Sequence, residues 1–305
     1  MKPVGPTNQP IPRTAYVLLV VLAVFWGGNW PLLKIAVREL PVFWFRLVCV
    51  WGSMAGLFAI AAASGLPIGL PRGERGRLLL VALFSIVGWN VFSGFGVLLL
   101  PAGRASMIGY TMPLWLVLLS AWVLHEKLTR RNLAGLGMGL LGIALLMGED
   151  LASLSRTPVG TLCMLGAATT WAIGITLVKA RPFSMPPTVQ TAWMMAAGGV
   201  PLAVLAALYS GLAIPAMSAA AFWSVVYNVL IAGVLCYWAF YKLVGLVPAS
   251  VTAISSLSVP VVGVVLSMAM LGEIPSFLDW IALVLIVGAL GVVLLFPNPP
   301  SRARS

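Results

Sequence analysis

Few residues in this chain could carry out catalytic or metal chemistry. The 305 residues include one histidine and three cysteines. The string His125-Glu126-Lys127-Leu128-Thr129 begins like the helical zinc motif of metalloproteases, but the second histidine of that motif is missing. The cysteines do not have the paired spacing of a zinc site or a disulfide framework. We therefore expect no catalytic residues, no metal and no cofactor, and a membrane-embedded enzyme is an alternative that these residues disfavour.

The side chains suited to bind a small molecule lie instead inside long apolar segments. An amide or hydroxyl facing lipid would lack a hydrogen-bond partner, so these groups must point to other helices or into a wet cavity. Large amphipathic rings are suited to pocket walls. The predicted substrate-binding residues are Asn29, Trp30, Trp89, Asn90, Tyr110, Trp171, Tyr237, Tyr241, Ser256 and Ser258. Hydrogen bonding between neighbouring helices is the alternative role for each of them.

Two prolines lie near the middle of apolar segments, Pro113 and Pro260. Proline lacks a backbone N–H and pushes away the carbonyl four residues earlier. The carbonyls of Gly109 and Ser256 would then be available to a ligand or a water. We predict a helix break or hinge at both prolines, with helix packing as the alternative explanation.

The two prolines belong to a duplication within the chain. They are 147 residues apart (260 − 113), and so are Glu126 and Glu273 (273 − 126). Further matches at a separation of 145 are Trp26 with Trp171 and Lys34 with Lys179. A unit of this length used twice indicates an internal repeat. The predicted organisation is a cytoplasmic tail (1–14), a first five-helix repeat (15–148), a connector (149–158), a second five-helix repeat (159–297) and a cytoplasmic tail (298–305).

The composition indicates that the repeats lie in a lipid bilayer. Apolar residues make up 61% of the chain and charged residues 8%, against roughly 45–50% and about 25% in soluble domains. A spanning helix needs roughly 20 apolar residues, and the chain has room for about ten. Because five spans per unit is an odd number, the second unit would begin on the opposite side of the membrane. We predict an all-α membrane protein of two inverted five-helix repeats, an arrangement typical of alternating-access transporters.

The distribution of basic residues predicts the orientation. With both termini on one side, four basic residues fall to the other side: Lys34, Arg38, Arg104 and Arg156. Arg46 lies inside the second span, where it would snorkel or guard an entrance, and the other thirteen (18 − 4 − 1) fall on the side of the termini. Cytoplasmic loops carry the excess of Lys and Arg, so we expect a multi-pass inner-membrane protein with both termini cytoplasmic. We expect Lys34 to snorkel to the interface. Because the basic residues are dispersed among short loops, the net charge of +11 does not predict nucleic-acid binding.

Several runs resemble a known family. They are FWGGNWPLLKIAVRELP, MPLWLVLLSAWVLHE and, in the second copy, VPVVGVVLSMAMLGE. These runs are similar to the EamA-type repeat of the drug/metabolite transporter superfamily, and the likeness covers nearly the whole chain outside the tails. Within it the chain is most similar to the YddG-like amino-acid exporters. The resemblance implies a ten-helix inverted-repeat bundle that exports amino acids, other metabolites or drugs. The second copy departs from the first where it reads WAIGITLVK in place of WGGNWPLLK, which predicts unequal roles for the two halves.

The predicted function is export of small metabolites by alternating access, with neutral and aromatic amino acids as the favoured cargo and broad specificity. No Asp or Glu lies in the middle of a predicted span, whereas proton-driven carriers place ionisable groups there, so we predict a facilitator. A proton-coupled multidrug or metabolite exporter is the alternative, and a channel is the alternative from another class. The expected partners are the small-molecule substrate and the lipid bilayer. The glycine-rich fifth and tenth helices are expected to form a scaffold away from the cavity, and they leave a monomer and a homodimer both open.

Overall fold

The computed structural model describes residues 12–123, 125, 128–152, 157–211, 213–246 and 249–294. Within these ranges, the side chains of residues 149–152, 157, 244–245, 249–256 and 294 are not described. The predicted features at Glu126 and at the side chain of Ser256 therefore lie outside the described residues. The part of the chain that is described is helical and contains no strand.

The first half of the chain forms five rods. They are α1 (Arg13–Glu39), α2 (Val42–Ala63), a composite rod (Arg72–Leu99), the pair α5 (Ala102–Gly109) and α6 (Met112–Val123), and α7 (Arg130–Ala152). The composite rod contains a 3₁₀ turn (Arg72–Glu74), α3 (Arg75–Ala82), a π-helical segment η2 (Leu83–Gly88) and α4 (Trp89–Leu99).

The second half of the chain is also helical in its described residues. It contains α8 (Thr157–Ala180), α9 (Pro187–Tyr209), a rod of α10 (Ala219–Val226), the π-helical segment η3 (Tyr227–Leu235) and α11 (Cys236–Leu246), then α12 (Ala249–Leu271) and α13 (Phe277–Leu294). Among the described residues, eight helices are long and apolar enough to cross a membrane, and Leu257–Leu271 and Phe277–Val293 are shorter apolar helices.

Proline and glycine set several helix boundaries. Pro41 and Pro186 precede α2 and α9, and Pro101 precedes α5, each with an extended ψ that brings the chain into the helix. Proline suits this place because its fixed φ matches a helix start and its missing N–H would have no partner there. Gly272 follows the last residue of α12 with a φ of 65°, a left-handed conformation that glycine adopts without steric cost.

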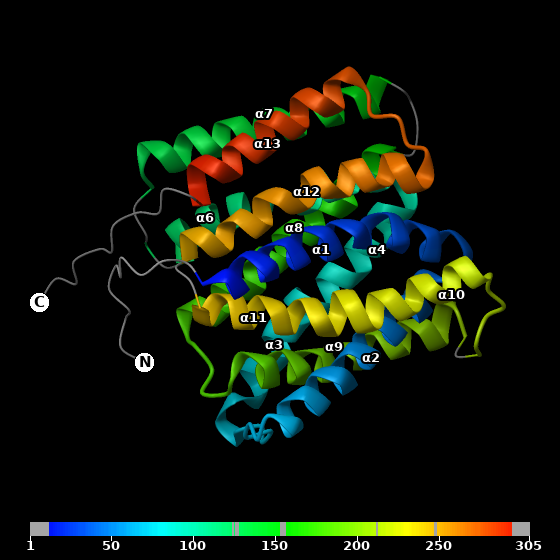
Figure 1. Ribbon diagram of the computed structural model, residues 1–305, viewed down its shortest axis with the longest axis vertical. Helices are drawn as coiled ribbons and strands as arrows, with labels where there is room; N and C mark the ends of the chain where they lie inside the picture. Colours follow the sequence, from blue (N-terminus) through cyan, green and yellow to red (C-terminus); the bar gives the residue numbers. More distant parts are fainter. Residues whose placement is uncertain are drawn as a thin grey trace, which may run out of the picture.

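The rods pack as one bundle in which neighbours in space are often distant in sequence (Figure 1). The closest pairings are α1 with α12, α2 with α9, α4 with α8 and α7 with α13. In Figure 1, α1 begins and α13 ends at the same end of the bundle. The opposite end, where α1 and α12 end and α5 begins, is called the Lys34 end below.

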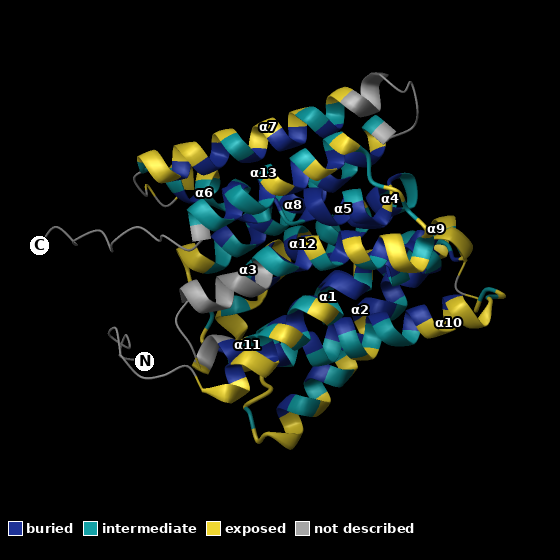
Figure 2. Cartoon of the chain, turned by 45° about the horizontal axis from the view of Figure 1, so that its top comes forward, coloured by how far each residue is buried: buried dark blue, intermediate teal, exposed yellow. Residues whose placement is uncertain are grey.

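The outside of the bundle is apolar. Buried residues face the interior, and the exposed positions run along the outer faces of the helices (Figure 2). Several of these exposed side chains are large and apolar: Trp122 is 78% exposed, Leu208 73% and Val284 70%. Such a surface is unfavourable in water and favourable against lipid, in agreement with a multi-pass membrane protein.

The two prolines behave differently. The fourth rod is interrupted beside Pro113, because α5 ends at Gly109 and α6 begins at Met112, with Tyr110 and Thr111 in a turn. In contrast, α12 runs through Pro260 as one helix. The break expected at Pro260 is therefore absent, since a membrane helix can lose one backbone hydrogen bond at proline without unwinding.

Candidate functional site

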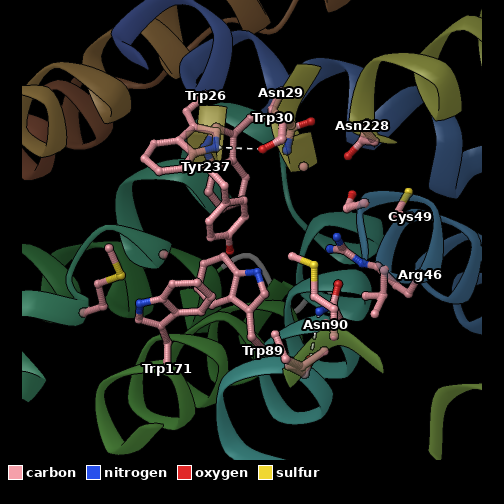
Figure 3. A pocket seen from close by; sticks show the side chains of 18 of the residues that line it. Trp26, Asn29, Trp30, Arg46, Cys49, Trp89, Asn90, Trp171, Asn228 and Tyr237 are labelled. Atoms are coloured by element: carbon pink, nitrogen blue, oxygen red, sulfur yellow. Dashed lines mark hydrogen bonds between the residues drawn. The ribbon is translucent and has the colours of Figure 1, made fainter. Parts of the chain in front are cut away.

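A cavity of about 170 Å³ lies in the centre of the bundle (Figure 3). Helices from both halves of the chain contribute to its wall. The lining residues are Trp26, Asn29, Trp30, Arg46, Cys49, Val50, Ser53, Ile86, Trp89, Asn90, Gly109, Tyr110, Met112, Trp171, Met195, Asn228, Ala232, Gly233 and Tyr237. Apolar and aromatic side chains dominate this wall, with a small number of polar groups, as in most small-molecule sites.

Three aromatic pairs shape the wall. The rings of Trp89 and Trp171 meet edge to face with centroids 5.1 Å apart, which joins α4 to α8. Trp26 and Tyr237 form a second edge-to-face pair at 5.8 Å, and Trp30 packs against the tyrosine at 110 at 6.3 Å. Edge-to-face pairs stabilise packed rings beyond their buried area, so the wall has a defined shape.

Close packing around Trp30 depends on a glycine. A Cβ atom at Gly109 would lie 2.8 Å from Cη2 of Trp30 and 3.0 Å from Cε of Met164. Side chains cannot approach so closely without moving. Gly109 thus allows the last turn of α5 to reach the ring that lines the cavity.

The π-helical segments supply acceptors at the cavity. The indole Nε1 of Trp26 donates to the carbonyl of Ala232 at 3.1 Å, and Ser53 Oγ donates to the carbonyl of Val229 at 3.3 Å. Both carbonyls belong to η3. π-Helical turns often occur at functional sites, and here they lie in the corresponding rod of each half, η2 before Trp89 and η3 before Tyr237.

Arg46 is the charged residue of the lining. It is 5% exposed, and its Nη2 donates to Ser93 Oγ at 2.8 Å. The guanidinium also lies 5.6 Å from the ring centre of Phe45. Gly94 makes room for it, because a Cβ there would lie 3.3 Å from Arg46 Nε. Arg46 therefore lies in the cavity wall and does not snorkel to the membrane interface, the first of the two roles expected for it.

The structure brings most of the predicted binding residues together. Those that line the cavity are Asn29, Trp30, Trp89, Asn90, Tyr110, Trp171 and Tyr237. Tyr241 is not part of the lining; its hydroxyl bonds to that of Thr191. Ser258 is half-buried outside the lining. Tyr241 follows Tyr237 by one helical turn, and the ring centres are 6.3 Å apart, so it supports the wall from behind.

Other lining residues were not among the predicted binding residues. They include Trp26, Arg46, Met195 and Asn228. Asn228 lies in an apolar run as Asn90 does, and the Nδ2 atom of each donates to the carbonyl four residues earlier. The same sequence pattern therefore predicts a position away from lipid for Asn228 as well. Met195 has no comparable signal, because a methionine in an apolar helix is ordinary.

Lys34 forms buried hydrogen bonds at one end of the bundle. Its Nζ donates to the carbonyls of Val97, Leu98 and Leu100 at 2.7, 2.8 and 2.7 Å, and the residue is 6% exposed. These carbonyls belong to the end of α4, where the last turn lacks partners within its own helix. The expectation that Lys34 snorkels to the interface is wrong, because this helix end lies within its reach.

Glu273 acts on the neighbouring helix start. Its carboxylate accepts from the backbone N–H groups of Ala102 and Gly103 at 2.7 and 3.0 Å. These are the first residues of α5, and an anion at a helix N-terminus is favourable. Beside it, Arg104 and Asp279 form an ion pair at 2.8 Å with both side chains about 10% exposed. Lys34 and Glu273 thus fix both sides of the α4–α5 connection.

The cavity holds no acidic residue among the described residues. Four of the seven acidic residues have described side chains, and all four bond elsewhere: Glu39 to Ser218, Glu74 to Ser184, Glu273 to α5 and Asp279 to Arg104. Nor do the described residues contain a cluster of His, Cys, Asp or Glu able to hold a metal ion.

A family model described as the EamA-like transporter family matches the chain twice, over residues 13–148 and 158–295. One relative, "Uncharacterized transporter YvbV" of Bacillus subtilis, is 28% identical over 303 residues, covering 97% of this chain and 94% of the relative. A second, "Probable amino-acid metabolite efflux pump" of Escherichia coli, is 26% identical over 285 residues, covering 90% and 92%. A solved crystal structure matches with a TM-score of 0.65 at 22% identity, covering 93% of this chain and 98% of that one. At this identity the structural likeness concerns the fold alone.

Proposed function

The chain belongs to the EamA-like transporter family, and we propose that it exports small metabolites, with neutral and aromatic amino acids as the main cargo. The relative named as an amino-acid metabolite efflux pump supports this cargo class. The observation that carries the proposal is the central cavity, whose wall combines six aromatic rings with three amides and one cation. Its volume of about 170 Å³ is below the roughly 300–1,000 Å³ of drug-sized sites, which favours a small metabolite over a drug.

Ten spans in two inverted repeats remain our proposal for the architecture. The helix contacts support it, because the strongest pairings have counterparts when the halves are exchanged. α1 packs on α12 and on the rod of α10 and α11, while α8 packs on α5 and α6 and on the rod of α4. The pairings α2 with α9 and α7 with α13 are their own counterparts. An inverted repeat of this kind places the site between the halves, where the cavity lies.

The contacts at the Lys34 end support alternating access. Lys34 and Glu273 hold the α4–α5 connection. Lys179, the counterpart of Lys34 in the second half, is exposed at the end of α8. Equivalent residues with different environments are expected when one end of a carrier is closed and the other is not. By the distribution of basic residues, we place the Lys34 end outside and both termini in the cytoplasm.

We propose a facilitator. No described acidic residue lines the cavity, and proton-driven carriers rely on such residues within the membrane. A proton-coupled multidrug or metabolite exporter remains the alternative. Pro113, beside the break in the fourth rod, is the proposed hinge in the first half; Pro260 is its proposed counterpart, within a continuous helix.

Counterflow in proteoliposomes tests the function. We expect saturable uptake of radiolabelled L-phenylalanine and L-leucine into vesicles loaded with the same amino acid, and no uptake of ethidium. Tyr110→Ala and Trp171→Ala should lower the apparent affinity at least about tenfold, because each removes an aromatic ring from the cavity wall. Trp122→Ala is the matched control, since that ring is 78% exposed on the outer face.

Each result decides between the alternatives. Uptake that does not saturate would favour a channel. Uptake of ethidium without uptake of any amino acid would contradict the proposed cargo. A facilitator carries amino acids without a pH gradient, so transport abolished by collapsing that gradient would favour the proton-coupled exporter.

A further inference from the structure

Two polar atoms in the cavity wall have no partner. Four buried side-chain polar atoms in the described part of the chain lack a hydrogen bond, and two of them belong to lining residues: Asn29 Oδ1 and Arg46 Nε. Buried polar groups are nearly always paired in folded proteins, so an unpaired one calls for an explanation. Here one atom is an acceptor and the other belongs to a cation.

The positive charge of Arg46 is not neutralised by the described residues. A guanidinium has five N–H donors, and that of Arg46 has one hydrogen-bond acceptor, Ser93 Oγ. No described carboxylate lies within salt-bridge distance, and the four described acidic residues bond elsewhere. A buried charge is costly unless it is paired. The fork of a guanidinium matches the two oxygens of a carboxylate.

Asn29 supplies the complementary group. Its Oδ1 can accept a hydrogen bond from an ammonium. Trp26 and Trp30 lie one turn before it and next to it on α1, and both line the same cavity (Figure 3). The faces of indole rings attract cations. This part of the wall can therefore bind a positively charged amine, because it offers a hydrogen-bond acceptor beside two indole rings.

We propose that the cavity binds a zwitterion, with the carboxylate on the Arg46 guanidinium and the ammonium on Asn29 Oδ1. This inference rests on the proposed transport function and deepens it. The aromatic pairs then enclose the side chain of the cargo. A cationic amine or drug without a carboxylate is excluded, because it would leave Arg46 unpaired and add a second positive charge to the same cavity.

The positive charge in the cavity wall comes from the first half of the protein, and the corresponding position of the second half is uncharged. Arg46 lies five residues after Pro41, and Thr191 lies five residues after Pro186, the proline that precedes the corresponding helix α9. Thr191 bonds to Tyr241 instead of lining the cavity. Because α2 begins at the Lys34 end, the carboxylate of the cargo points toward that end.

Three probes of similar size test the assignment. L-Phenylalanine has both charged groups, phenethylamine lacks the carboxylate, and 3-phenylpropionate lacks the ammonium. Binding is measured by ligand-induced shifts in melting temperature, and transport by competition in counterflow. For the wild type we expect phenethylamine to bind roughly 100-fold more weakly than phenylalanine, since hydrogen bonds to charged groups are the strong ones.

The variants separate the two contacts. Arg46→Gln should weaken phenylalanine and 3-phenylpropionate by about 10- to 100-fold and leave phenethylamine unchanged or tighter. Asn29→Leu should weaken phenylalanine by about fivefold and leave 3-phenylpropionate unchanged. Arg38→Gln is the control. It removes an exposed positive charge at the Lys34 end of α1 and should leave the binding of all three probes unchanged.

Equal binding of phenethylamine and phenylalanine to the wild type would overturn the proposal, as would undiminished phenylalanine binding by Arg46→Gln. If Arg46→Gln does not fold, the wild-type comparison of the three probes decides alone. Failure of the transport proposal is distinguishable: phenylalanine and 3-phenylpropionate would then bind through Arg46 without being carried.

Discussion

Replacing Lys34 with methionine should open the Lys34 end of the bundle. The ammonium donates to the carbonyls of Val97, Leu98 and Leu100, at the end of α4, at 2.7 to 2.8 Å and is almost fully buried. Methionine keeps an unbranched side chain of similar length and removes every donor. Opening this end in the transport cycle must break these hydrogen bonds, so their loss lowers the cost of opening.

The size of the effect follows from the contacts. Hydrogen bonds to a charged group contribute about 1.5–3 kcal/mol each. Burial of the ammonium offsets several kcal/mol of that sum. A net loss of about 3 kcal/mol corresponds to a roughly 150-fold shift toward the state that is open at the Lys34 end.

Cys49 lines the cavity and reports the opening. In a background with Cys163→Ser and Cys236→Ala, a membrane-impermeant thiol reagent added outside cells should label Cys49 at least tenfold faster in Lys34→Met than in wild type. Lys179→Met, the counterpart in the second half, should not speed labelling from outside. A second background that keeps Cys236 as its one cysteine detects unfolding, because that thiol is fully buried outside the lining. An unchanged labelling rate at Cys49 in a folded Lys34→Met protein would refute the idea that the Lys34 hydrogen bonds keep this end of the bundle closed.

The remaining predictions concern packing around the site. Gly109→Ala should weaken phenylalanine counterflow at least several-fold, because the added Cβ would lie 2.8 Å from a cavity ring; Gly137→Ala, where a Cβ meets nothing within 4 Å, should transport normally. Arg104→Met and Asp279→Leu should each lower the melting temperature. A double-mutant cycle on the free energy of unfolding should give a coupling of about 1–3 kcal/mol, and additive effects of the two changes would contradict a stabilising ion pair. Tyr241→Phe should cost about 1 kcal/mol of stability through its lost hydrogen bond and leave the affinity for phenylalanine unchanged. A large loss of affinity would show that Tyr241 contacts the substrate.

Much of the fold followed from the sequence because a bilayer limits the choices. Long apolar segments in lipid must be helices, since their backbone groups have no other partners. The same reasoning placed Asn29, Asn90 and Trp171 inside, because polar or amphipathic groups at mid-span cannot face lipid. The duplicated prolines and glutamates pointed to the family that the match over 13–148 and 158–295 confirms.

Other features depended on the tertiary structure. The sequence gives the depth of Lys34 and Arg46 along their helices but not what lies across from them. The end of α4 lies within reach of Lys34, and no described carboxylate lies within reach of Arg46. Likewise Tyr241 fits the sequence pattern of a binding residue, but it lies behind the cavity wall. Pro260 fits the pattern of a helix break, but it lies within a continuous helix. Which residues must avoid lipid depends on local chemistry and is therefore predictable from the sequence. Which of those residues meet at the cavity depends on the packing of helices that are distant in the sequence.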